Sequence, residues 1–130
     1  MSMRVNADGS IDFLRGKQTY RFEKQNYDRH AKKRPKILHQ KFLNEIETTI
    51  TDPDCITVGS QLNKENFYRV VYFDDIRGTR FLTFWKIPVF YHNKNFAVIA
   101  TAIEKNAPNF YAINPLENRK VPWRKTNSQI

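Results

Sequence analysis

The sequence predicts an α+β fold in which N-terminal helices pack on a curved antiparallel sheet of about four strands. Two observations support this prediction: helical periodicity lies in the first half of the chain, and runs of aromatic and β-branched residues lie in the second half. The length of 130 residues fits a single domain, 1–130, which can bury a core without disulfides or a structural metal. The 14% aromatic content also indicates a folded chain.

A basic helical region is predicted over residues 28–50. Asp28 can cap a short first helical turn through Lys33, and Pro35 either ends that turn or begins the next helix. The second helix is amphipathic, and Asp52-Pro53-Asp54 ends it in a turn. Its apolar side chains recur at intervals of three and four residues: Ile37, Leu38, Phe42, Ile46 and Ile50.

The sheet core is predicted over residues 66–104. Pro88 indicates an edge position or a bulge in the second strand, whereas the small, apolar third strand is expected to be central. A basic, flexible tail is expected over 117–130. The predicted strands are 66–75, 80–91 and 96–103, the last two joined by a hairpin loop at 92–95, and residues 10–24 form a further short hairpin that turns near Arg15-Gly16-Lys17.

The charge of the chain indicates a nucleic-acid partner. Lysine and arginine number 22 against 13 acidic residues, which gives a net charge of +9. Residues 29–44 contain six Lys or Arg, two His and no acidic residue, so this stretch is suited to meeting phosphates. An anionic membrane surface is a weaker alternative, because the stretch lacks an inserting aromatic face. A basic chain without a specific partner is the other alternative.

Several classes of protein are excluded by what the sequence lacks. Cys55 is the only cysteine, so a disulfide framework or thiolate metal cluster is not expected, and cytoplasmic residence fits best. The sequence shows no signal peptide and no run of apolar residues of membrane-spanning length. Phosphate-binding glycine loops, serine-hydrolase elbows and metal-ligand spacings are also missing, so no cofactor is expected. A domain cut from a larger delivered toxin would look the same, and that alternative stays open.

The remaining chemistry is metal-independent RNA cleavage, in which the 2′-hydroxyl attacks the adjacent phosphate. Such a site needs a proton carrier and cations that stabilise the charged transition state. His30 is the leading candidate, because the surrounding cations favour the neutral, basic form of its imidazole. A solvated histidine at a helix start is the alternative. His39, beside the apolar stripe, and His92, in the hairpin loop, are interpreted as structural.

Four segments carry a resemblance to a known family: DRHAKKRPKIL, FLNEIETTITDPDCI, FYRVVYF and VIATAI, within residues 28–103. Together they resemble the phage-type branch of the barnase–EndoU–colicin–RelE superfamily of small RNase toxins. The resemblance implies His30 as acid or base, Arg34 as a phosphate ligand, and catalytic or substrate-contacting roles for Tyr68, Arg69 and Thr101.

The sequence departs from the family pattern in two places. Lys33-Arg34-Pro35-Lys36 replaces an Arg-His-Pro-Glu element, so a second histidine and an acid are missing, and no aromatic residue follows Thr101-Ala102.

The implied site residues also have plain structural interpretations. Arg69 can be the polar alternate of an amphipathic strand, Tyr68 a core residue, and Thr101 a favourable strand former. The basic residues can simply form a solvated face. The residues predicted to bind RNA are Arg29, Lys32, Lys33, Arg34 and Lys36.

Three functions follow from these observations. The first is a metal-independent endoribonuclease toxin that cleaves tRNA or other RNA and is neutralised by an acidic antitoxin or immunity protein. The second is a non-catalytic RNA-binding module, in which exposed aromatic rings could stack on bases. The third is an interaction domain for an acidic protein.

Overall fold

A computed structural model describes residues 2–59, 61–76, 79–107 and 123–124 of the chain. Within them lie two α-helices, a short 3-10 helix and nine strands, so the α+β class is confirmed. The helices are α1 (Lys24–Ala31), the 3-10 helix (Lys36–Leu38) and α2 (His39–Thr51). The strands are β1 (Met3–Val5), β2 (Ile11–Arg15), β3 (Gln18–Phe22), β4 (Cys55–Val58), β5 (Lys64–Ile76), β6 (Thr79–Asn93), β7 (Phe96–Ile99), β8 (Ile103–Ala107) and β9 (Trp123–Arg124).

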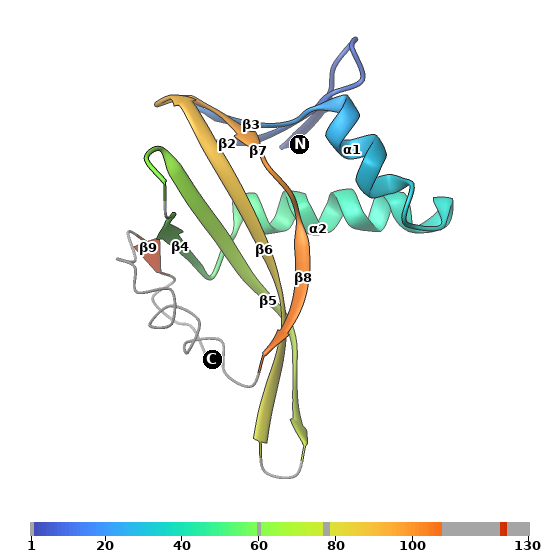
Figure 1. The fold of residues 1–130 in the computed structure, drawn as a ribbon, viewed down its shortest axis with the longest axis vertical. Coiled ribbons are helices and arrows are strands. Elements are labelled where there is room, and N and C mark those ends of the chain that lie inside the picture. Colours follow the sequence, from blue (N-terminus) through green and yellow to red (C-terminus); the bar gives the residue numbers. More distant parts are fainter. Residues whose placement is uncertain (1, 60, 77–78, 108–122, 125–130) are drawn as a thin grey trace.

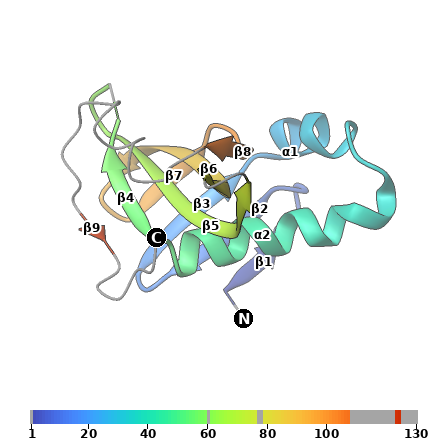
Figure 2. The same ribbon diagram turned by 90° about the horizontal axis from the view of Figure 1, so that it is seen from below.

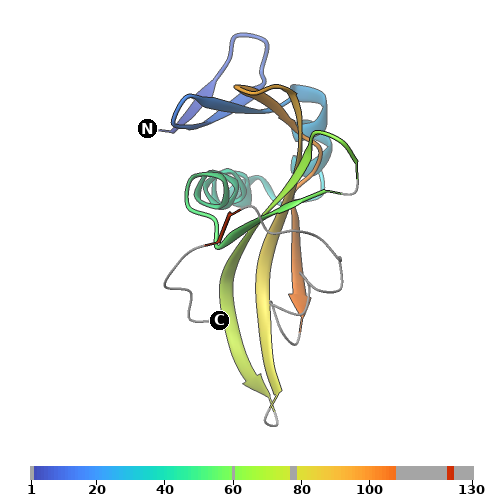
Figure 3. The same cartoon turned by 90° about the vertical axis from the view of Figure 1, so that its left-hand side faces the viewer.

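The strands form one mostly antiparallel sheet that bends around α2 (Figure 3). Its order is β1-β2-β3-β7-β6-β5-β4-β9. β8 also pairs with β6, along residues 82–86, whereas β7 pairs with residues 89–93 of the same strand. The apolar side chains of α2 face the sheet, and three members of the predicted stripe, Phe42, Ile46 and Ile50, are buried, as is Leu43. The other two members of the stripe, Ile37 and Leu38, are exposed, because they lie in the 3-10 helix before α2 and not in α2 itself. The buried side chains of α2 pack in one core with the inner faces of β2, β3, β5, β6 and β7.

The predicted sheet of about four strands and the N-terminal position of the helices are wrong. Three strands, β1 to β3, precede α1, and the sheet is about twice as wide as predicted. The predicted hairpin over 10–24 is present as β2 and β3, with Gly16 in the turn at φ 60°. What local pattern could not indicate is that β3 pairs in parallel with β7, which is distant in the sequence and makes the hairpin part of the main sheet.

The first helix begins earlier than the sequence predicts. Asp28 does not cap it, because α1 starts at Lys24 and Asp28 lies inside it, where its Oδ2 is 2.6 Å from Lys24 Nζ. The helix ends before Pro35, as expected for a residue that disfavours helical backbone in front of it. The connection to α2 lies away from the sheet in both views (Figures 1 and 2).

Pro88 lies in an interior strand, not at an edge or in a bulge. It sits in β6 opposite Asn66 of β5, with β7 and β8 on the other side of β6. Pro88 falls where β7 gives way to β8, and its oxygen accepts a hydrogen bond from the Ala100 backbone N–H at 2.9 Å. The missing N–H of proline therefore falls at a gap between two ladders, which explains why the sheet tolerates it.

The predicted third strand, 96–103, is divided into two strands. β7 lies between β3 and β6, which confirms its central position, and β8 continues along β6 after a break at residues 100–102. The predicted tail, 117–130, lies outside the described residues except for β9, which pairs with β4. No helix among the described residues is both long and apolar enough to cross a membrane.

Candidate active site

His30 lies near the end of α1, and both of its ring nitrogens have hydrogen-bond partners. Nδ1 is 2.9 Å from the backbone oxygen of Asn26, and Nε2 is 2.8 Å from Oγ1 of Thr101. His30 and Thr101 are both half-buried, so their side chains keep some contact with solvent. The structure thus brings together two of the four predicted catalytic residues.

The two partners of His30 differ in what they can do. A carbonyl oxygen only accepts, so Nδ1 carries a proton, and Nε2 of the neutral ring accepts a hydrogen bond from the Thr101 hydroxyl. When the ring is protonated, Nε2 donates to the same hydroxyl oxygen. The pair therefore keeps its hydrogen bond in both protonation states, which suits a histidine that takes up and releases a proton.

The break between β7 and β8 positions Thr101 against α1. β3 pairs with β7 only as far as Val98 and then gives way to α1, which takes its place beside the broken strand. Asn26 Nδ2 donates hydrogen bonds to the backbone oxygens of Ile99, at 3.1 Å, and Ala100, at 2.9 Å. Asn26 thus ties α1 to the break with its side chain and orients His30 with its backbone oxygen.

Aromatic rings support His30 from the core side. Its ring packs edge-on against Phe22, with centroids 5.3 Å apart, and parallel to Phe42 at 6.0 Å. Arg34 places its Cζ 4.0 Å from the centroid of Phe42 and donates a hydrogen bond from Nη1 to the backbone oxygen of His30 at 2.9 Å. Burial, with a smaller contribution from Asp28, raises the pKa of the neighbouring Tyr27, so its phenol stays neutral near pH 7.

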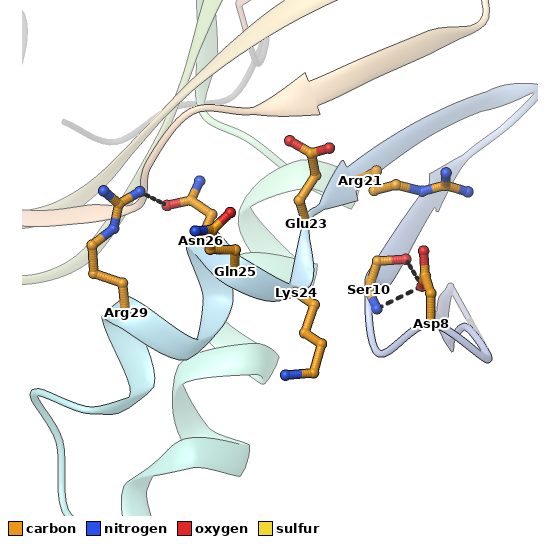
Figure 4. A pocket seen from close by; sticks show the side chains of 8 residues that line it. All are labelled: Asp8, Ser10, Arg21, Glu23, Lys24, Gln25, Asn26 and Arg29. Carbon is orange, nitrogen blue, oxygen red and sulfur yellow. Dashed lines mark hydrogen bonds between the residues drawn. The ribbon is translucent and has the colours of Figure 1, made fainter.

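Five cations lie at the end of α1, which carries His30, and in the segment that follows it. Arg29, Lys32, Lys33 and Lys36 are exposed, and Arg34 is half-buried. None of these five residues forms an ion pair with another residue of the described ranges. Arg29 donates a hydrogen bond to Asn26 Oδ1 at 2.8 Å, close to His30 in the sequence (Figure 4). The predicted RNA-binding residues therefore gather around the connection from α1 to α2.

Tyr68 and Arg69 are neighbours in β5 and point to opposite faces of the sheet. Tyr68 is fully buried and packs against Phe84, with the Lys86 ammonium 5.7 Å from its ring centroid. Arg69 lies on the α2 face, where it is ion-paired with Glu45 and donates a hydrogen bond to Thr49 Oγ1 at 3.1 Å. The structure therefore does not place Tyr68 beside His30, and it ties Arg69 to α2.

The other two histidines have structural contacts. His39 Nε2 is 2.9 Å from the backbone oxygen of Ala31 and 3.2 Å from that of Arg34, so the ring closes the turn between α1 and α2. His92 is exposed beside Phe96, with ring centroids 5.8 Å apart. His, Cys, Asp and Glu side chains do not gather in groups of three or more that could hold a metal ion in the part of the chain that the structure describes.

A wide hollow of about 760 Å³ lies beside the start of α1 (Figure 4). Its charges are mixed and mostly engaged: Asp8 accepts from Ser10, Arg21 pairs with Asp12, and Lys24 pairs with Asp28. Glu23 and Arg29 also line it and form no ion pair among the described residues. Because the hollow holds two carboxylates and two of its three cations are paired, it offers less to an anionic ligand than the exposed lysines that follow α1.

Two functional candidates escaped sequence reasoning. Asn26 lies four residues before His30, a spacing that puts both on one helix face, and that spacing is the one signal that could have found it. Glu45 has no local signal of this kind, because its role depends on Arg69 from a distant strand.

Comparison of the chain with known protein families, characterised proteins and solved structures finds no match.

Proposed function

We propose that this chain is a metal-independent endoribonuclease in which His30 moves a proton at the cleaved phosphodiester. One observation carries the proposal: the 2.8 Å hydrogen bond between His30 Nε2 and Thr101 Oγ1, at a half-buried position near the end of a helix that continues into a segment of exposed cations. The hydroxyl can donate to Nε2 of the neutral ring and accept from Nε2 of the protonated ring, so it supports a histidine that exchanges a proton.

In the proposed reaction the RNA 2′-oxygen forms a bond to phosphorus and the bond from phosphorus to O5′ breaks. Neutral His30 takes the proton of the 2′-hydroxyl, directly or through Thr101, and protonated His30 can return a proton toward O5′. Arg34 and the exposed lysines balance the charge that develops on the phosphate oxygens. The products are a 2′,3′-cyclic phosphate and a free 5′-hydroxyl.

The test is incubation of the purified protein with total tRNA and ribosomal RNA in EDTA. We expect cleavage with 2′,3′-cyclic phosphate ends, and a loss of about 100-fold or more in His30→Ala. His92→Ala, which changes an exposed histidine in a different part of the sheet, is the matched control and should cleave like wild type. Equal cleavage by wild type and His30→Ala would show that the site lies elsewhere.

A role as a toxin acting in the cytoplasm is part of the proposal and rests on the family resemblance. The exposed cations near His30 would then also bind an acidic antitoxin or immunity protein. Such a partner should stop RNA cleavage when added in equimolar amount, and its effect should weaken as salt is raised.

An RNA-binding module without catalysis is the second candidate. The lysines at 32, 33 and 36 favour it, because they are exposed and make no ion pair within the described ranges. RNA that is retarded on a native gel but stays intact in the cleavage assay would support this candidate over the first. Cleavage and retardation both absent would leave an interaction domain for an acidic protein.

A further inference from the structure

A smaller pocket lies directly beside the His30 site and shares two side chains with it. Its volume is about 220 Å³, and its lining includes Phe42 and Arg34, which also contact His30. Lys41 and Glu45 from α2 and Trp85 from β6 complete the part of the lining that matters here. A ligand in this pocket would therefore be next to the proposed reaction centre.

The walls of the pocket are suited to a flat ring. Phe42 and Trp85 form its closed floor, since they are only 3% and 5% exposed, with ring centroids 5.8 Å apart, and Leu38, which is 42% exposed, supplies open apolar surface. The Arg34 guanidinium lies over Phe42, and a guanidinium plane is a surface on which nucleobases stack. The volume is below the roughly 300–1,000 Å³ of pockets that hold drug-sized ligands, so it suits one ring system.

The polar groups of the pocket indicate what kind of ring it can bind. Glu45 is held by its ion pair, in which Oε2 accepts from Arg69, while Oε1 accepts no hydrogen bond from any residue of the described ranges. The Lys41 ammonium likewise has no ion-pair partner among them. The pocket therefore offers one carboxylate oxygen, Glu45 Oε1, that is fixed by the Arg69 ion pair and open to a donor on a ligand. It also holds a second, exposed carboxylate, Glu104, and a cation, Lys41, that can meet a phosphate.

We propose that this pocket binds the base of an RNA nucleotide adjacent to the cleaved phosphate and prefers bases that carry an amino group. This inference rests on the proposed function. A carboxylate oxygen accepts a hydrogen bond from the amino group of cytosine, adenine or guanine. Uracil presents two carbonyl oxygens around a single N–H, and those oxygens are repelled by the carboxylate. Glu45 is thus the specificity-determining residue.

The sharpest test compares two ligands that differ at this group, cytidine 3′-monophosphate and uridine 3′-monophosphate. Calorimetric titration of the wild-type chain should show about tenfold tighter binding of the cytidine nucleotide, as expected for one charge-assisted hydrogen bond. The chain has two tryptophans, so Trp123→Phe leaves Trp85 as a single fluorophore in the pocket wall. Its fluorescence should change as either nucleotide binds.

Matched variants separate the carboxylate from the cation. Glu45→Gln keeps an oxygen that can accept from Arg69 but adds an amide, and it should reduce the preference for cytidine to about twofold or less. Lys41→Gln should weaken the binding of both nucleotides about equally and leave the preference for cytidine unchanged. Thermal unfolding of each variant checks that the fold is retained.

The binding measurement does not depend on RNA cleavage, so the two proposals can fail separately. Preferential cytidine binding without cleavage by the wild type would support the pocket and overturn the nuclease. Cleavage with equal binding of the two nucleotides would overturn the pocket and keep the nuclease. If Glu104→Gln, a change at another carboxylate of the lining, removes the preference while Glu45→Gln keeps it, the assignment to Glu45 is wrong.

Discussion

At the scale of single residues, the proton transfer proposed for His30 relies on the hydroxyl of Thr101, which is 2.8 Å from Nε2. The backbone oxygen of Asn26 holds Nδ1 as a donor, which leaves Nε2 as the nitrogen that changes its proton. A threonine hydroxyl can follow that change because its hydrogen rotates. The carbon framework of Thr101 contributes little to this function, so the hydroxyl can be tested by itself.

Thr101→Val removes the hydroxyl and keeps a β-branched side chain of similar shape. We expect RNA cleavage to fall about 10- to 100-fold, because the proton contact of His30 is lost. Thr101→Ser restores the hydroxyl and should recover most of the rate. Initial rates in EDTA measure both variants, and a Val variant as fast as wild type would contradict the role of this hydrogen bond.

Among the described residues, Asp12 is expected to have the clearest effect on how the free energy of unfolding depends on pH. Burial by itself raises the pKa of this carboxyl, but hydrogen bonds from Arg21 and Arg4 outweigh burial and lower the pKa to about 2. The folded-state pKa lies below the unfolded value of 3.8. The stability from this group is therefore fully present above about pH 4 and is lost as the pH falls toward 2.

We expect the contribution of Asp12 to the free energy of unfolding to fall by about 2 kcal/mol between pH 4 and pH 2. Urea unfolding at several pH values in this range measures it. Asp12→Asn should be less stable at pH 5, because Arg4 and Arg21 lose their carboxylate, and its stability should vary less over the same range. An equal acid dependence in both proteins would assign the effect to other groups.

At the scale of elements, the site exists because a helix attaches to a broken strand. Where β3 ends, α1 takes its place beside the end of β7, and residues 100–102 leave the ladder between β7 and β8. Pro88 lies opposite this gap and does not lose a hydrogen bond there. Pro88, the residue that suggested an edge strand in the sequence, thus lies opposite the strand break that contains Thr101.

Asn26→Ala removes the two hydrogen bonds that the Asn26 side chain donates to the strand break, while the contact of His30 with Thr101 is not removed directly. We expect a loss of about 1–3 kcal/mol in the free energy of unfolding, because two partly buried carbonyl groups lose their donor. RNA cleavage should also fall, since α1 carries His30. Urea unfolding measures the stability, with Gln25→Ala, an exposed neighbour on α1, as the control that should stay within about 0.5 kcal/mol of wild type.

At the scale of the whole molecule, much of the net charge of +9 lies in one segment, residues 29–44, which contains six Lys or Arg and no acidic residue. This segment includes the connection between α1 and α2. The connection between α1 and α2 carries exposed lysines, and Ile37 at its 3-10 helix is 87% exposed. Exposed charge of this kind supplies binding to RNA that depends on salt and carries little sequence information.

Combined replacement of Lys32, Lys33 and Lys36 by glutamine should weaken binding to single-stranded RNA and make it less sensitive to salt. Each phosphate contact contributes about 0.7 to the slope of log K against log salt, so we expect the slope to become less steep by about 2. Fluorescence anisotropy at several salt concentrations measures it. Lys17→Gln, in the turn at the opposite end of β3 from α1, should change the slope little, and an equal change there would indicate diffuse binding.

Local patterns in the sequence predict the α+β class, the apolar side of α2 from Phe42 onward, the long strands and the basic segment around His30, because periodicity and local charge are properties of neighbouring residues. Tertiary structure alone decided the parallel pairing of β3 with β7, the interior position of Pro88 and the separation of Tyr68 from His30. It also decided that Glu45 meets Arg69 beside the proposed base pocket. These features depend on contacts between segments far apart in the chain, whose pairing and register no local pattern specifies.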